Sequence, residues 1–557
     1  MVFRYCTSRW MVACVLVGIV ALGLTGGCHN PDRYKRKADK EVYGILTNKW
    51  QDEFGEQVNY QVSDQAPNDV NIAQLIPPSG VINLAQAVHI ATQISRDYQS
   101  QKESLYLAAL DLTGTRHQYQ MQWFGTFDAF YAKNNGVEDP TASAEVGVDK
   151  TFLLGDGILI STGLAVDWLR YLSGDPDTSL GSVLTASINA PLLGAGAGKA
   201  ARENLTQAER NVLYRIRTFN RFRKTFVVSI INSYYSVLQR RDTVMVREDS
   251  YRRQVDTTKQ LIMEADVGKL AQSAADEARQ DLLSAENSLV SARQSYQQAL
   301  DNFKLELSLP TDVQISLDQS ELPALEAAGV YQPPVTEEEA AQIALDRRLD
   351  LANTRDGVDD VERKLILAAE GLGVQLNLVG SANVDSTPET AFTRLRFHEG
   401  GYSLGVVGDL PFDRLAERNA YREALITVQQ RQRAYDEDVD SIKLTIRQAF
   451  RDLAETAETY RIQKIGLDLA QNRVLEQKIR LKNGRGVIRD LQNSEASLVQ
   501  AQILVTNALI SHTIAKLNFF RDIGLLQVRP DGMWEQVDYG TSDRQANTQS
   551  IGSELPG

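Results

Sequence analysis

The sequence predicts a mainly α-helical chain with a smaller β part, built from two internal repeats. Three observations predict it: a heptad seam that occurs twice, two very long helices, and several stretches that alternate polar with apolar residues. Subtracting 216 from each position of the later seam gives the earlier one, as expected for a duplication. The later seam is Leu491, Ser494, Leu498, Ala501, Val505, Ala508, His512, Ala515 and Phe519; the earlier is Ala275, Ala278, Leu282, Ala285, Leu289, Ala292, Tyr296, Ala299 and Phe303.

Residues 1–27 have the pattern of a secretory signal peptide, with a basic start and the short apolar run Trp10–Leu24. Cleavage before Cys28 would leave the mature chain with a single cysteine, at its first position. We interpret Cys28 as a lipidated N-terminal cysteine, although Thr25 stands where a bacterial lipobox usually has Leu. The alternative is an ordinary signal peptide followed by a chance cysteine. In lipoproteins an Asp after the cysteine favours the inner membrane, so His29 favours the outer one.

Composition limits the classes of function. The chain has 557 residues, is 43% hydrophobic and 24% charged, and carries a net charge of −13, which argues against nucleic acid as a partner. After the signal peptide we find no apolar run long enough for a membrane helix. The segment from Gly194 to Lys199 suggests a phosphate loop, but Ala200 stands where Ser or Thr is needed. We therefore expect no enzyme activity, no catalytic residues, no metal site and no cofactor apart from lipid on Cys28.

The remaining segments are assigned in order. Residues 28–83 are polar and proline-bearing and are predicted to be a lipid-anchored N-terminal linker. Repeat 1 covers 84–310 and repeat 2 covers 336–526, because the apolar spacing at Ala87 and Ile90 returns at Ala340 and Ile343. A proline-rich linker, 311–335, separates the repeats. Residues 527–557, rich in Gly, Ser and Gln, are expected to form a disordered tail.

Each repeat contains a pair of alternating strands. They are predicted at Gln118–Tyr131 and Val183–Ala190 in repeat 1, and at Val374–Val384 and Tyr402–Val407 in repeat 2. We expect the intervening 134–181 to form an outward loop or an extension of the hairpin. The alternation fits a soluble sheet as well as a barrel with lipid outside and water inside. Four strands cannot close a barrel, so several chains would be required, and three would supply twelve strands.

A long helix follows each strand pair. The helices are predicted at Lys199–Asp266 and Leu415–Lys482, and each would be about 100 Å long at 1.5 Å per residue. The return helices, Lys269–Leu307 and Val487–Ile523, are about half as long. Two further helices, 84–112 and 337–371, would complete the return to the strands. Such lengths suit a tube that crosses an aqueous compartment better than a compact domain.

The order helix, strand pair, long helical hairpin, repeated twice, resembles the TolC-like outer-membrane efflux family. The local motifs also match: NGRGVIRDLQNSEASLVQAQ from Asn483, RRLDL from Arg347 and DLPF from Asp409. The resemblance covers Leu84 to Leu526 and implies a homotrimeric α/β barrel. It would have a twelve-stranded outer-membrane β-barrel, four strands per chain, continued by an α-helical coiled-coil tunnel in the periplasm.

The resemblance also implies a function and partners. The trimer would be the exit duct of a tripartite efflux or type I secretion system and would export small molecules or proteins. It would dock on a periplasmic adaptor (a membrane fusion protein) and an inner-membrane RND or ABC transporter, with outer-membrane lipid around the barrel. The alternative is a lipid-anchored coiled-coil scaffold in the periplasm that has no pore.

Candidate site residues lie at the hairpin tips, the part that a periplasmic partner meets end-on. A tight reversal between long helices requires residues that tolerate left-handed backbone angles. The predicted adaptor-binding tips are Gly268, Lys269, Gly484, Arg485 and Gly486.

Asp490, with Arg489 beside it, is the candidate for a periplasmic gate. In a trimer its three carboxylates would repel one another and attract a cation or a basic partner, Arg485 or Arg489. The alternative is a surface ion pair, worth less than about 1 kcal/mol. Ala274 occupies the equivalent position in repeat 1, so this feature is not duplicated.

Overall fold

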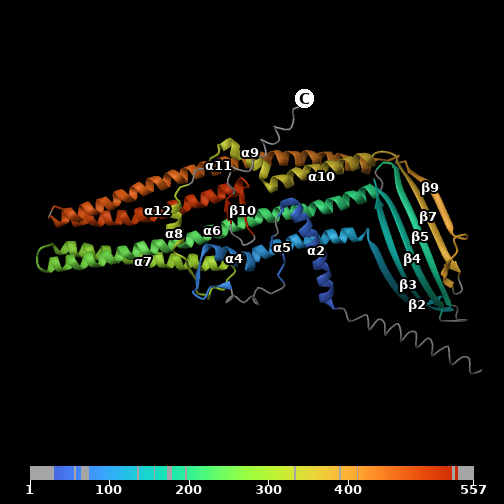
Figure 1. The fold of residues 1–557 in the computed structure, drawn as a ribbon, viewed down its shortest axis with the longest axis horizontal. Coiled ribbons are helices and arrows are strands. Elements are labelled where there is room, and N and C mark those ends of the chain that lie inside the picture. The colour runs from blue at the N-terminus through green and yellow to red at the C-terminus, as the bar shows by residue number, and fades with distance from the viewer. Residues whose placement is uncertain are drawn as a thin grey trace, which may run out of the picture.

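The computed structural model describes residues 30–55, 58–63, 75–134, 137–155, 157–171, 178–194, 197–330, 334–387, 391–410, 412–483, 485–529 and 534–536. The molecule is elongated, with a twisted sheet at one end and two helical hairpins at the other (Figure 1). This arrangement confirms the prediction of a mainly helical chain with a smaller β part.

Two antiparallel helical hairpins form the long axis. In the first, α6 (Ala197–Asp266) packs against α7 (Gln272–Glu306), and in the second α11 (Leu415–Lys482) packs against α12 (Ile488–Asp522). The 70 residues of α6 and the 68 of α11 correspond to about 105 and 102 Å at 1.5 Å per residue. The predicted ends of all four helices agree with the structure within three residues.

The helices that complete the return to the sheet are each broken once. The first consists of α4 (Leu84–Ile94) and α5 (Arg96–His117), and the second of α9 (Glu337–Arg347) and α10 (Leu349–Gly371). The single helices predicted for 84–112 and 337–371 are therefore wrong in this detail. Ser95 and Arg348 adopt extended backbone angles at the breaks, and they are 253 positions apart, the same offset that relates Ala87 to Ala340. Neither break contains Pro or Gly, so the sequence carries no strong signal for it.

The core lies midway along the molecule, where the repeats pack together. It buries one face of α6 and the seam of α12, with aromatic contacts such as Phe450–Phe519 and Tyr234–Phe303. Contrary to the expectation of no further apolar run, α12 is long and apolar enough to cross a membrane, with a mean hydropathy of 1.3. It nevertheless packs along α11 and α6, because its apolar residues follow the heptad seam rather than surround the helix.

The segment predicted as an N-terminal linker contains a helix, α2 (Pro31–Phe54). Asn30 caps its start and Gly55, with φ 71°, ends it. Its buried residues, Val42, Leu46 and Trp50, are spaced four apart and so share one face. Trp50 packs edge-on against Phe219 of α6 with ring centroids 6.2 Å apart. The polar outer face of α2 led us to interpret 28–83 as a linker, and for α2 that interpretation is wrong.

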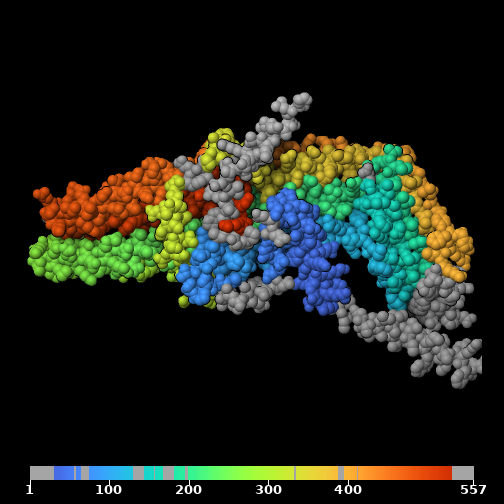
Figure 2. Space-filling view, in the orientation of Figure 1, coloured from blue at the N-terminus to red at the C-terminus, as the bar shows by residue number. Residues whose placement is uncertain are grey.

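The interrepeat linker and the tail also contain ordered elements. The strand β6 (Ser316–Leu317) pairs in parallel with β1 (Val81–Ile82), and α8 (Glu321–Ala328) follows it. In the tail, β10 (Leu526–Val528) pairs with β11 (Trp534–Gln536), which corrects the expectation of disorder for these residues. Buried Leu526 and Val528 explain the difference, since they join the core. In Figure 2, α8 and α2 cross the middle of the molecule over the long helices.

The sheet differs most from the prediction. Its long strands run in the order β2–β3–β4–β5–β7–β9, and all neighbours are antiparallel. The prediction of four strands per chain is wrong, because residues 134–181 supply a further hairpin of the same sheet. The strands are β2 (Met121–Asn134), β3 (Val137–Leu154), β4 (Ile158–Tyr171), β5 (Thr178–Leu193), β7 (Gln375–Thr387) and β9 (Gly401–Asp409), with the short β8 (Ala391–Leu395) beside β7.

Candidate functional site

The register gives the sheet two chemically different faces. Residues directly opposite one another in neighbouring strands lie on the same face. One such row consists of Trp123, Val148, Leu164, Leu184 and Val384, from β2 through to β7. Every residue in this row is apolar, although the row combines strands from both repeats.

The apolar face continues to the sheet's far edge and is most exposed near the two edges, while Val384 between them is buried. On β9 it carries Tyr402, Leu404 and Val406, which lie opposite Ala382, Gly380 and Leu378. Trp123 and Leu404, near the two edges, each expose 76% of their surface. An exposed apolar face this wide is what hydrocarbon covers in an outer-membrane barrel.

Polar residues line the opposite face. One row consists of Gln122, Asp149, Gly163, Thr185 and Asn383, and a second contains Thr151, Ser161, Ser187, Ser381 and Ser403. Hydroxyl pairs cross the strands, Thr151 with Ser161 at 3.1 Å and Ser381 with Ser403 at 2.7 Å. This face is suited to contact with water, as the lumen wall of a barrel is.

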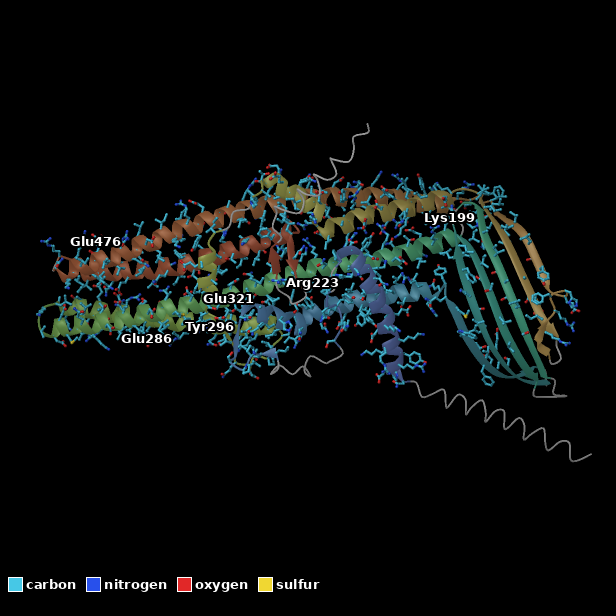
Figure 3. The ribbon with its side chains drawn as sticks, in the orientation of Figure 1. Lys199, Arg223, Glu286, Tyr296, Glu321 and Glu476 are labelled. Atoms are coloured by element: carbon cyan, nitrogen blue, oxygen red, sulfur yellow. The ribbon has the colours of Figure 1, made fainter. Side chains whose placement is uncertain are left out.

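The hairpin formed by β3 and β4 contacts the start of α6 through its turn. Arg202 of α6 donates a hydrogen bond to the carbonyl oxygen of Gly155, 2.6 Å away, in the β3–β4 turn. Gly157 and Gly198 touch backbone to backbone, so a Cβ on either residue would clash with the other. Lys199, the lysine of the suspected phosphate loop, instead pairs with Glu370 of α10 at 2.9 Å where the helices meet the sheet (Figure 3). Gly198 and Arg202, at the start of α6, therefore contact the turn of the β3–β4 hairpin.

A buried polar network holds together α6 and α10, two of the helices that connect to the sheet. Asp360 on α10 is 4% exposed and accepts hydrogen bonds from Tyr214 at 2.6 Å, Gln207 at 2.9 Å and Arg363 at 2.8 Å. Burial disfavours the charged carboxylate, but these bonds and the nearby charge of Arg210 outweigh burial and lower the pKa of Asp360. The network links α6 to α10. Because β5 leads into α6 and β7 follows α10, it also holds the helix-side ends of these two strands together.

In both hairpins, the long helix that leads away from the sheet (α6 or α11) ends at the tip in the same way. Gly268 has φ 76°, and the amide of Lys269 donates to the carbonyl of Glu264 at 2.9 Å. In the second tip the amide of Arg485 donates to the carbonyl of Arg480, also at 2.9 Å. Each bond joins residues five apart, as in a Schellman motif, and 216 positions separate the two bonds. Gly484 lies outside the described residues.

Gly486 is the most crowded of the candidate tip residues. A Cβ there would lie 2.8 Å from the backbone nitrogen of Leu481, so any side chain would force the turn to shift. By contrast, Gly268 has open space around its Cβ position and is constrained only by its backbone angle. Lys269 and Arg485 are both exposed at the tip surface.

The two gate candidates, Arg489 and Asp490, both lie at the start of α12. Arg489 pairs with Glu277 of α7 at 2.9 Å. Its role beside Asp490 in a trimer stays a prediction. Asp490 lies exposed in the first turn of α12, where the helix dipole favours a negative charge. Glu277 had not been identified from the sequence, because its role depends on the contact between hairpins that are far apart in the chain.

The elements and faces described above define the fold of outer-membrane channel proteins. The chain is similar to VceC from Vibrio cholerae, with 14% identity over 79% of this chain and 96% of that one, and a TM-score of 0.56. It is also similar to the CmeC outer membrane channel of Campylobacter jejuni, with 12% identity over 85% and 90% of the chains and a TM-score of 0.57. The open MtrE outer membrane channel of Neisseria gonorrhoeae gives 12% identity, 84% and 96% coverage, and a TM-score of 0.56.

These likenesses confirm the resemblance to the TolC-like channels at the level of the fold. No protein-family model and no curated protein sequence matches the chain. Cys28 lies outside the described residues, so its lipidation stays a prediction.

Proposed function

We propose that three copies of this chain form an outer-membrane exit duct, in which the sheet is the membrane wall and the helices line a periplasmic tunnel. The observation that carries the proposal is the continuous apolar face of the sheet, directly joined to helices about 100 Å long. A sheet with open edges cannot stand alone in lipid, so the wall must close between copies.

The tunnel would deliver cargo from an inner-membrane pump of the RND or ABC type through a periplasmic adaptor. The hairpin tips lie at the end of the molecule farthest from the sheet, which is where such an adaptor would dock. Cargo would be small molecules or proteins, and the pump would select it. Lipid on Cys28 would anchor the mature N-terminus in the outer membrane.

The gate role of Asp490 belongs to the same proposal. Its exposed position near the tip allows three carboxylates to surround the trimer axis and bind a divalent cation. The pair Arg489–Glu277 would hold the two hairpins of each chain together around this ring.

The second candidate function is a lipid-anchored coiled-coil scaffold without a pore. The sheet argues against it, because a scaffold in water gains nothing from a wide exposed face that includes Trp123 and Leu404. Migration of the outer-membrane fraction on a gel, with and without heating, tests the choice. A heat-sensitive trimer in that fraction supports the duct, whereas a band at the monomer mass that heating does not change supports the scaffold.

A further inference from the structure

We propose that the membrane wall of the trimer is an eighteen-stranded barrel, in which β2 of each copy pairs with β9 of the next. The inference rests on the proposed function, since it assumes three copies around one axis. It goes beyond it by stating how many strands form the wall, which edges meet, and how wide the lumen is.

The first argument is that the β3–β4 hairpin belongs to the wall. Val146, Val148 and Leu164 continue the apolar face, while Asp149 and Ser161 continue the polar one. A loop beyond the membrane would have no reason to keep this alternation in register with its neighbours. The turn of the hairpin, at Gly155 and Gly157, also rests on α6, so the hairpin spans the full height of the sheet.

The second argument concerns the edges. Within the described residues, β2 pairs only with β3, and β9 pairs only with β7 among the long strands. The chain leaves α5 along β2 and returns to α11 along β9, so these edges run in opposite directions (Figure 1). The edges of neighbouring copies can therefore form an antiparallel ladder without reversing either strand. Hydrocarbon offers their amides and carbonyls no other partner.

The third argument is the stagger that closure requires. The register of the sheet places Gly401 of β9 straight across from Gln122 of β2, through Asp149, Gly163, Thr185 and Asn383. Asp409, at the helix end of β9, is eight residues further along, whereas Met121 is one residue beyond Gln122. In the closed barrel, β2 of the next copy lies beside β9. Bringing the helix-side ends of these two strands to the same height therefore needs a slide of seven residues of one strand along the other. The slide must be an even number of residues to keep the polar faces of the two strands on the same side, so it is six or eight.

That stagger gives a normal barrel. Six or eight residues at about 3.3 Å correspond to about 20–26 Å, and six strands at about 4.8 Å give a width of about 29 Å per copy. The strand tilt is then about 35–43°, within the range of about 35–45° for closed barrels. If β4 rather than β2 were the edge strand, each copy would contribute four strands and the slide would be two or four residues. The strand tilt would then be only about 19–35°.

The width of the helical layer agrees with the larger barrel. The described helices α5, α6, α10 and α11 pack side by side where they meet the end of the sheet, so three copies would place twelve helices in a ring. Spaced about 8–10 Å apart, they form a circumference of about 96–120 Å. At the tilts given above, eighteen strands give about 105–118 Å and twelve give about 61–70 Å. The lumen at the membrane would then be about one and a half times as wide as in a twelve-stranded barrel.

Disulfide cross-linking between copies tests the proposal in intact outer membranes. With a slide of six residues Ser403 lies beside Thr126, and with eight it lies beside Asp128, so Ser403→Cys is combined with Thr126→Cys or with Asp128→Cys. Neighbouring strands place the Cα atoms about 4.5–5.5 Å apart, a distance that a disulfide bridges. One of the two double variants should give cross-linked dimers and trimers on a non-reducing gel, and the single variants should give none.

The matched control replaces β2 by β4. Ala165 lies straight across the sheet from Phe124 on the same face, and in a twelve-stranded barrel with a slide of four residues it would approach Ser403 of the next copy; with a slide of two, Gly163 would do so. Cross-linking of Ser403→Cys with Ala165→Cys, or trimers with no cross-link in either β2 variant, would overturn the eighteen-stranded wall and leave the duct intact. A chain that remains monomeric in the membrane would refute the duct as well.

Discussion

Arg489 on α12 donates two hydrogen bonds to one carboxylate oxygen of Glu277 on α7, at 2.9 and 3.1 Å. The bond joins the two helical hairpins at the end farthest from the sheet. Beside it, burial and the charge of Glu277 raise the pKa of Asp281, and Arg489 partly offsets this effect. A single arginine therefore balances two acids at the interface between the hairpins.

We expect Arg489→Ala to loosen the tip without unfolding the protein. The pair is exposed, so its loss should cost at most about 1 kcal/mol of folding free energy. The conductance of single channels in a planar bilayer should rise severalfold, because the hairpins of each chain can separate. Arg279→Ala is the matched control, since Arg279 pairs with Asp276 within the same helix at 3.0 Å. Equal conductance in wild type and Arg489→Ala would exclude a role for this pair in closure.

Asp490→Ala should weaken block by divalent cations added on the periplasmic side. Removing three carboxylates from one ring removes most of its attraction for a cation, so the half-blocking concentration should rise at least tenfold. Asp468→Ala, at an exposed position within α11, serves as the control. Unchanged block in Asp490→Ala would leave Asp490 as a surface residue.

Gly486→Val should reduce cross-linking to the periplasmic adaptor severalfold while the trimer stays intact. The new side chain would meet the backbone of Leu481 and displace the tip. Gly466→Ala, in α11, has open space at its Cβ position and should behave as wild type. Full cross-linking in Gly486→Val would place the docking surface elsewhere.

The buried His512 should make stability fall in mild acid. Burial, and secondly the charge of Lys516, lower the pKa of His512, so between that pKa and about 6.5 the unfolded chain binds more protons than the folded one. Stability should therefore decrease as the pH drops below about 6.5. The melting temperature of His512→Gln should depend less on pH over this window. Parallel profiles for the two proteins would contradict the assignment.

Cys28→Ser should abolish N-terminal lipidation. Labelling with palmitate and mass spectrometry of the mature N-terminus should show lipid on the wild type and none on the variant. Cys14→Ser, inside the predicted signal peptide, should leave labelling unchanged. An unmodified wild-type N-terminus at another residue would refute the lipoprotein interpretation.

The long helices could be predicted almost to the residue because their apolar positions repeat over many turns. Leu415–Lys482 agrees at both ends, and the duplicated seam also indicated which residues are equivalent. Local periodicity of this strength persists whatever the tertiary contacts are.

Other elements could not be predicted, because the pattern of their residues becomes clear only when the segments that they pack against are known. Within β3, Gly147 and Lys150 interrupt the alternation, and only pairing with β2 and β4 shows which face each residue occupies. The helix α2 exposes most of its surface, so its three buried residues look unremarkable until Phe219 is beside Trp50. The link between Arg489 and Glu277 likewise needs both hairpins in place.

The conductance of the purified trimer in a planar lipid bilayer tests the central claim most directly. The duct predicts stepwise ionic currents when the protein inserts, with a polar lumen that conducts across the whole membrane. A trimer that is demonstrably inserted in the bilayer but passes no current, in wild type and in Arg489→Ala alike, would contradict it.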